Sequence, residues 1–188
     1  MPNSAPRTSR SAPSSPTGIT ISYSVCVIDL LDLAAELVDI PSVSHDETAI
    51  ADHFERQLTG AAHLQVERVG NNVVARTTLG RTHRLVVAGH LDTVPANDNL
   101  GARIEGDRLY GLGACDMKGG LAAQLATALR VTDPLVDVTY VFYEGEEVAA
   151  RYNGLLRLFG DRPELVAGDV ALLGEPTSAG IEAGCQGT

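Results

Sequence analysis

The chain has 188 residues, 44% of them apolar, and a formal net charge of −10 from 14 basic and 24 acidic residues. This length suffices for one domain with a sizeable core. The acidic balance disfavours binding to nucleic acids or anionic membranes, which requires clustered Lys and Arg. No apolar stretch reaches the roughly 18 to 20 residues of a membrane span. The three cysteines form no CxxC pair, so we expect a soluble protein of a reducing compartment, the cytoplasm.

The N-terminal residues differ in composition from the rest of the chain. Residues 1–24 are rich in Ser and Pro and contain no acidic residue, which predicts a disordered tail. A transit peptide and a misassigned start are alternatives. Asp29 and Asp32 interrupt the first apolar stretch, which argues against a secretory signal. The folded part is therefore expected in residues 25–188.

Two helices are expected first. Apolar residues recur at helical intervals from Val27 to Ile40, which predicts a helix. Ser44 and Glu47 have the spacing of a capping box, and an apolar stripe recurs every four residues from Ile50. This pattern predicts a second helix that Ser44 caps.

Strands and helices then alternate along the chain. We expect strands within residues 64–69, 72–77, 84–90, 136–147 and 169–176, a hairpin over 103–111, and helices over 117–131 and 149–159. Such alternation favours an α/β fold with a mostly parallel, buried sheet flanked by helices. Ligands of such folds bind at the carboxyl ends of the strands.

Several metal-ligating side chains follow the predicted strands or precede a helix. They are His90 and Asp92 after "RLVVAG", Glu146 and Glu147 after "VTYVFYEG", Glu175 after "VALLG", and Asp116 in "GACDMKGG". Carboxylates held close together raise one another's pKa unless a counter-charge is present. Imidazole and carboxylate ligands without thiolate suit zinc or another divalent first-row metal. The sequence therefore predicts a metal site at the sheet ends.

Each of these residues also has an ordinary structural interpretation. A histidine after a strand is often solvated, an Asp before a helix is often an N-cap, and a Glu pair often opens a helix. Cys115 is a candidate thiolate ligand, although a small buried residue is the favoured interpretation. Two other classes stay open, a non-catalytic metal-binding relic and a metal-free structural domain.

Four motifs carry a resemblance to a known family. "GHLDTVP", "GACDMKGG", "YEGEEV" and "LLGEPT" resemble, in order and approximate spacing, those of the dinuclear zinc amidohydrolases, which include aminoacylases, glutamate carboxypeptidases, acetylornithine deacetylases and succinyl-diaminopimelate desuccinylases. "GEPT" followed by "IEAGCQGT" is most similar to the desuccinylase branch, especially its actinobacterial form. That branch implies hydrolysis of N-succinyl-LL-2,6-diaminopimelate to succinate and LL-2,6-diaminopimelate. Acetylornithine deacetylase and a dipeptidase or carboxypeptidase are the alternatives within the family.

The resemblance implies a role for each candidate residue and a zinc-exopeptidase-like catalytic domain. Two Zn²⁺ ions would occupy a complete site, with Co²⁺ as a substitute. The implied metal ligands are His90 and Glu175 for the first ion, Glu147 for the second and Asp116 as the bridge. Asp92 would accept a hydrogen bond that fixes the His90 imidazole. Glu146 would be the general base that takes a proton from water and returns it to the leaving amine.

The length of the chain departs from the family pattern. Family members are about twice as long and carry a lid domain that also forms their homodimer, whereas one domain is the limit here. We therefore expect an N-terminal part of the catalytic domain, without the late histidine of the second zinc and without most groups that recognise the substrate. This part alone is expected to bind closer to one zinc than two and to lack activity. Its expected partner is a small N-acyl amino acid.

Overall fold

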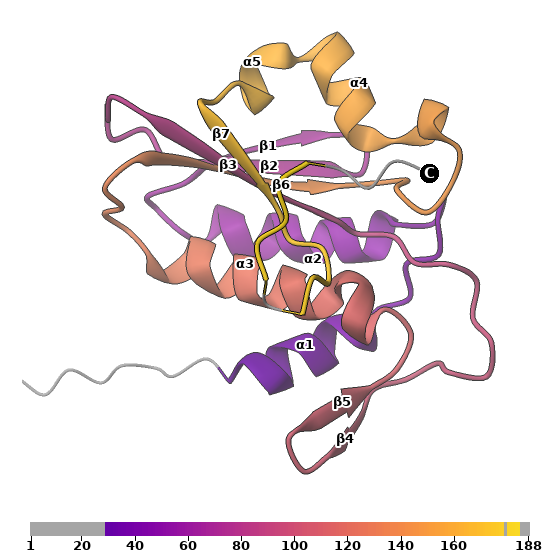
Figure 1. Cartoon of the computed structure of the whole chain (residues 1–188). Coiled ribbons are helices and arrows are strands. Elements are labelled where there is room, and N and C mark those ends of the chain that lie inside the picture. The colour runs from indigo at the N-terminus through magenta and orange to yellow at the C-terminus, as the bar shows by residue number, and fades with distance from the viewer. Residues whose placement is uncertain (1–28, 179, 185–188) are drawn as a thin grey trace, which may run out of the picture.

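The computed structural model describes residues 29–178 and 180–184. The predicted tail and the first residues of the first predicted helix lie outside this part of the chain. A five-stranded sheet stands between two layers of helices, and a small hairpin projects from one side (Figure 1). No helix of the described residues is both long and apolar enough to cross a membrane.

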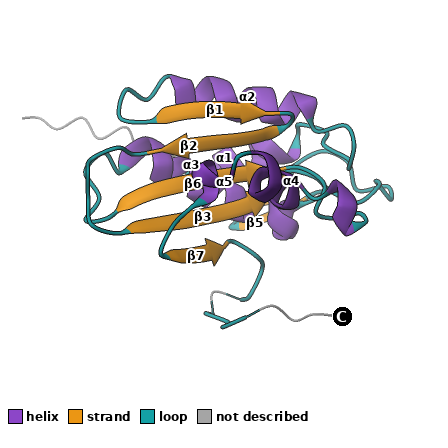
Figure 2. Ribbon diagram, turned by 90° about the horizontal axis from the view of Figure 1, so that it is seen from above, coloured by secondary structure: helices purple, strands orange, loops and turns teal. Residues whose placement is uncertain are grey.

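The central sheet has the strand order β1-β2-β6-β3-β7 (Figure 2). Its strands are β1 (Gln65–Val69), β2 (Asn72–Arg76), β3 (Arg84–His90), β6 (Asp137–Tyr143) and β7 (Val170–Leu173). Strand β3 runs parallel to both β6 and β7, whereas β2 runs antiparallel to both β1 and β6. The α/β class is confirmed, with a mixed sheet in place of a mostly parallel one. The tight turn at Gly70, whose φ is 65°, joins β1 to β2 and makes them antiparallel.

Helices cover both faces of this sheet. Those on one face are α2 (Thr48–Thr59) and α3 (Gly119–Arg130), with α1 (Leu30–Val38) packed against α3, and those on the other are α4 (Gly154–Asp161) and α5 (Pro163–Val166) (Figure 1). Strand β6 is buried along its whole length, because its alternating side chains face both layers. Phe142 packs on Phe54 of α2 with ring centroids 4.4 Å apart, and Val141 packs in the cluster that contains Leu158 of α4.

Two predicted helices differ from the structure. Helix α2 begins at Thr48, and its N-cap is Glu47 without a side-chain cap hydrogen bond, so the capping box of Ser44 is wrong. The helix predicted over 149–159 is divided into a short 3-10 turn, η2 (Ala150–Tyr152), and α4. Asn153 separates them, because its side chain accepts a hydrogen bond from the Leu155 amide and caps α4. The predicted hairpin is confirmed as β4 (Arg103–Glu105) and β5 (Arg108–Tyr110).

The carboxyl ends of the three parallel strands lead into the candidate site residues. His90 is the last residue of β3, the Glu146–Glu147 pair lies in the loop after β6, and Glu175 lies after β7. Asp116 lies in η1 (Ala114–Lys118), an irregular turn that leads directly into α3. The fold therefore places these segments at one end of the sheet, where α/β proteins bind ligands.

Candidate metal centre

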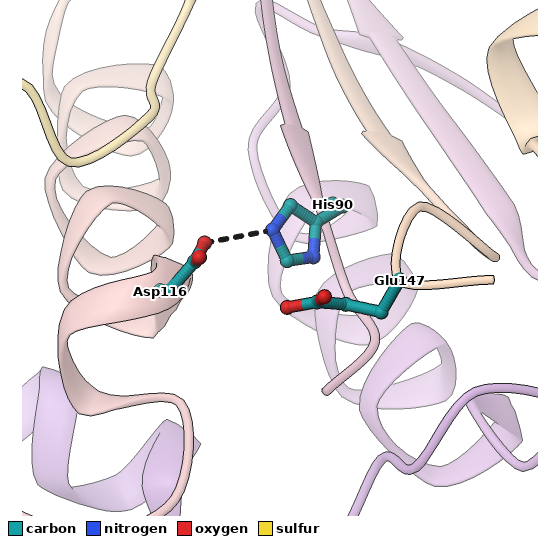
Figure 3. Close-up of side chains that lie close together, drawn as sticks. All are labelled: His90, Asp116 and Glu147. Carbon is teal, nitrogen blue, oxygen red and sulfur yellow. Dashed lines mark hydrogen bonds and ion pairs between the residues drawn. The ribbon is translucent and has the colours of Figure 1, made fainter. Parts of the chain in front are cut away.

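His90 is buried and has a different partner at each ring nitrogen. Its side chain is 1% exposed, and Nδ1 donates to the backbone carbonyl oxygen of Asp92 at 2.9 Å. Nε2 lies 3.0 Å from Oδ1 of Asp116 (Figure 3). With Nδ1 protonated, the lone pair of a neutral ring lies on Nε2, the atom that faces the carboxylate. Nε2 is therefore the atom available to a metal ion.

Three side chains form a group that could hold a cation. One ligand atom from each of His90, Asp116 and Glu147 lies within 4.8 Å of the other two, and the three side chains point toward a common space (Figure 3). They come from the end of β3, from η1 and from the loop after β6. Their nitrogen and oxygen donors match those of a divalent first-row metal.

The electrostatics of the group favour a positive charge at its centre. Burial lowers the pKa of His90, but hydrogen bonds with Asp92 and Asp116 outweigh burial and raise it to about 9. The metal-free ring therefore holds a second proton on Nε2, against the Asp116 carboxylate. Burial raises the pKa of Glu147, and the nearby Asp116 charge raises it further. A cation in place of that proton would relieve the repulsion between the carboxylates.

Asp92 holds the backbone of the glutamate pair. Its Oδ1 accepts a hydrogen bond from the Glu146 amide at 2.9 Å, and its Oδ2 accepts one from the Glu147 amide at 3.0 Å. Oδ2 also accepts a hydrogen bond from the Ser44 hydroxyl at 2.7 Å. Burial raises the pKa of Asp92, but these bonds and the contact with His90 outweigh burial and lower it to about 2. Asp92 is therefore a buried carboxylate that stays ionised.

The expected contact between Asp92 and His90 takes a different form in the structure. The backbone carbonyl oxygen of Asp92 accepts the hydrogen bond from Nδ1, and the carboxylate is farther away, with Oδ1 at 3.5 Å from Nδ1. Both contacts favour the same tautomer. The carboxylate oxygens of Asp92 also accept hydrogen bonds from the backbone amides of Glu146 and Glu147.

Glu146 and Glu175 lie outside the three-residue group. Glu146 is exposed, although its backbone is anchored next to Glu147. Glu175 is half-buried and close enough for its charge to raise the pKa of His90. Burial raises the pKa of Glu175, with a further contribution from the Asp116 charge. The structure thus brings three of the four predicted ligands together, and the fourth contributes through its charge.

An open cavity of about 400 Å³ adjoins the group. Its lining includes Thr93, Val94, Leu112, Cys115, Asp116 and Glu147. Cys115 is exposed, so the expectation of a small buried residue is wrong. Its thiol does not belong to the metal-ligating group found among the described residues, because η1 directs Asp116 toward His90. The cavity offers space for a ligand beside both carboxylates.

Two contacts of this site were not anticipated from the sequence. The Ser44 hydroxyl was assigned to a helix cap, but it lies against Asp92, 48 residues away. The sulfur of Met117 accepts a hydrogen bond from the His90 amide at 3.2 Å, and its buried side chain packs in the core. For Met117, the only feature of the sequence that indicates a place in the site is its position next to Asp116 in a motif. For Ser44, the sequence indicates a helix cap and nothing that connects it with Asp92.

The chain is similar in sequence to known proteins. Residues 86–185 match Peptidase family M20/M25/M40. A Corynebacterium glutamicum protein named succinyl-diaminopimelate desuccinylase is 48% identical over 164 residues, which are 85% of this chain and 44% of that protein. A Mycobacterium tuberculosis protein provisionally named as the same enzyme is 49% identical over 161 residues, covering 85% of this chain and 46% of that protein. The chain thus spans about half the length of the curated relatives it matches.

A solved structure shows the same fold. The M20 family metallo-carboxypeptidase from Sulfolobus solfataricus has a TM-score of 0.66 and 21% sequence identity, over 78% of this chain and 37% of that protein. The family match covers more than half of the chain and contains His90, Asp116, Glu147 and Glu175. The chain therefore belongs to Peptidase family M20/M25/M40.

Proposed function

We propose that the protein acts in the metal-dependent hydrolysis of an amide bond, with N-succinyl-LL-2,6-diaminopimelate as the substrate. The observation that carries the proposal is the convergence of His90, Asp116 and Glu147, with Glu146 anchored beside them. The substrate follows from the relatives of 48% and 49% identity, both named for desuccinylation of this compound. The products are succinate and LL-2,6-diaminopimelate.

The donor set supports a divalent cation at this site. His90, Asp116, Glu147 and Glu175 would hold the metal, with His90 and Glu175 as ligands of one ion, Glu147 as a ligand of the other, and Asp116 contributing to both. Zinc fits imidazole and carboxylate donors, Co²⁺ is a substitute, and two ions would occupy a complete site. A bound divalent cation supplies charge that polarises an amide carbonyl and lowers the pKa of a water molecule.

We assign the proton transfers to Glu146. Its side chain is exposed and outside the group that could hold the ion, while the bond from its amide to Asp92 fixes its backbone. Glu146 takes a proton from the attacking water and returns it to the nitrogen of the leaving amine, so the amide C–N bond breaks and a carboxylate and an amine form. Two adjacent glutamates thus have separate roles, Glu147 as ligand and Glu146 as base.

The proposed partners and location follow the same reasoning. The small N-acyl amino acid would enter through the cavity beside Asp116 and Glu147. A cytoplasmic location suits the free thiol of Cys115, because exposed thiols persist in reducing compartments. A homodimer formed through a lid domain stays a prediction for the full-length relatives.

A substrate panel tests the proposal. The purified full-length protein is incubated with zinc or cobalt and with N-succinyl-LL-2,6-diaminopimelate, N-acetylornithine or dipeptides. The release of the amine product is measured. The expected result is metal-dependent release that is fastest from the succinyl compound and absent after treatment with a chelator. Preference for N-acetylornithine or a dipeptide would refute the substrate, and hydrolysis that survives the chelator would refute the metal site.

A further inference from the structure

We propose that Ser44 is a positioning residue of the metal centre and acts through Asp92. This inference rests on the proposed function, because it assigns a new residue to the same site. Ser44 lies in the loop between α1 and α2, far in sequence from the four motifs. Its hydroxyl donates a hydrogen bond to Oδ2 of Asp92 at 2.7 Å.

The backbone fixes Ser44 in this place. Val43 forms a parallel β-bridge with Thr93. The Ser44 amide donates to the carbonyl oxygen of Thr93 at 3.1 Å, and the Thr93 amide donates to the carbonyl oxygen of Ser42 at 2.9 Å. The loop between α1 and α2 thus pairs, over one short stretch, with the segment that follows β3. Because Thr93 directly follows Asp92, this pairing sets the hydroxyl against the Asp92 carboxylate.

The Ser44 bond limits how the Asp92 carboxylate can turn. Each oxygen holds one amide of the glutamate pair, Oδ1 that of Glu146 and Oδ2 that of Glu147. Rotation of the carboxylate about its Cβ–Cγ bond would weaken both bonds, and Ser44 opposes this rotation through a third bond. The backbone carbonyl oxygen of Asp92 also accepts a hydrogen bond from Nδ1 of His90. One residue thus connects two predicted ligands and the predicted base, and Ser44 anchors it.

A role as a helix cap does not account for the Ser44 hydroxyl. Helix α2 begins at Thr48, with Glu47 as an N-cap that lacks a side-chain cap hydrogen bond. The second contact of the hydroxyl, with the carbonyl oxygen of Thr93, is longer, at 3.4 Å. Both contacts point to the segment after β3. The polar bond of Ser44 thus serves the metal centre.

Ser42 provides a matched control. It belongs to the same loop, and its hydroxyl is buried without a hydrogen-bond partner in the part of the chain that the structure describes. Ser42→Ala therefore removes a buried hydroxyl of the loop but no bond to a carboxylate. Ser44→Ala removes the bond, and Ser44→Thr keeps a hydroxyl that can donate it.

The test uses the 188-residue chain and two readouts. The first is the amide proton resonances of Glu146 and Glu147 in the metal-free, ¹⁵N-labelled chain. The second is the affinity for Co²⁺, measured by visible absorption. We expect Ser44→Ala to shift both resonances and to weaken Co²⁺ binding by up to about tenfold, the low end of the effect for groups that hydrogen-bond a metal ligand directly, because Ser44 acts through Asp92. Ser44→Thr and Ser42→Ala should stay close to the parent chain in both readouts.

The outcomes separate this inference from the proposed function. Ser44→Ala and Ser42→Ala spectra that are equally close to the parent, with equal Co²⁺ affinity, would overturn the role of Ser44. A parent chain without affinity for Co²⁺ would overturn the metal site, while the two amide resonances would still decide whether Ser44 holds Asp92. If Ser44→Ala does not fold, Ser44→Cys replaces it, because a thiol is a weak donor and should give a smaller shift in the same direction.

Discussion

Substitution of Asp92 by asparagine should weaken both the fold and the metal site. Its two oxygens accept the amides of Glu146 and Glu147 on opposite sides of the carboxylate. An asparagine has one acceptor oxygen and one NH₂ donor. Either orientation of Asp92→Asn therefore places the NH₂ group against a backbone N–H and leaves that amide without an acceptor.

The size of the stability loss can be worked out in two ways. A hydrogen bond to a buried charged group contributes about 1.5–3 kcal/mol. The pKa of Asp92 is lowered from 3.8 to about 2, which corresponds to about 2 kcal/mol. Because the folded-state pKa is depressed, this contribution is present above pH 3.8 and is lost as the pH falls to about 2. The loss in the free energy of unfolding caused by Asp92→Asn should thus have its full size at pH 7 and be small at pH 2.

Asp137 is the matched control for this prediction. Its buried carboxylate also accepts two backbone amides, those of Leu79 and Arg81, and one hydroxyl, that of Thr77. Although burial raises the pKa of Asp137, these bonds lower it to about 2. Asp137 does not belong to the metal-ligating group. Asp137→Asn should therefore cost a similar free energy of unfolding and leave metal affinity unchanged.

Urea denaturation and Co²⁺ titration of the parent and both variants check this reasoning. Both variants should lose about 2 kcal/mol in the free energy of unfolding at pH 7. Only Asp92→Asn should also lose about 10- to 100-fold in affinity for Co²⁺. Equal metal affinity in the two variants would refute the link between Asp92 and the metal centre, and parent-like stability of Asp92→Asn would refute the energetic argument.

Three further predictions concern the ligand, the base and the loop before Glu175. Co²⁺ affinity should rise with pH up to about 9, because the pKa of His90 is raised to about 9 and the ion must displace a proton; calorimetry that detects no proton release would contradict this. Glu146→Gln at full expressed length should keep its zinc and lose about 10²- to 10⁴-fold in turnover, and near-normal turnover would exclude Glu146 as the base. In Gly174→Ala the new Cβ would lie 2.1 Å from Nε2 of Gln124. Because displacement of this amide would break its buried hydrogen bond to the Ala88 carbonyl oxygen, we expect a loss of about 1–3 kcal/mol in urea denaturation. Gly160→Ala, where nothing lies within 4 Å, is its control, and equal stability of the two would refute the clash.

The parts of the fold that depend on local pattern could be predicted from the sequence. Strand β3 has the predicted bounds, 84–90, because its short apolar run is typical of a buried strand. The predicted hairpin over 103–111 is confirmed, and Gly106, between its two strands, has a φ of 64° that suits a tight turn. The division of the helix after residue 149 was not predicted, although Asn153, which caps α4, is of a residue type common at helix starts. Close packing of Gly154 on a distant strand is a second cause, which no local pattern shows. There, a Cβ on Gly154 would lie 1.8 Å from Oδ1 of Asn72.

The candidate site was predicted as a set of residues, but its connections were not. His90, Asp116 and Glu147 could be found because each follows a strand or precedes a helix at the ligand-binding end of an α/β sheet. The partner of Ser44 could not be found, because a capping box is a pattern of near neighbours and the observed bond spans 48 residues. The place of Glu175 depends on the conformation of its loop, which no periodicity specifies.

Zinc binding by the parent chain and His90→Ala tests the central claim most directly. The purified 188-residue chains are loaded with zinc and dialysed, and zinc per chain is measured by atomic absorption, with His83→Ala as the control. His83 is an exposed histidine that pairs with Asp169, outside the metal-ligating group. We predict about one zinc per chain for the parent and for His83→Ala, and almost none for His90→Ala. Equal zinc in all three chains, or none in any, would contradict a metal centre built on His90, Asp116 and Glu147.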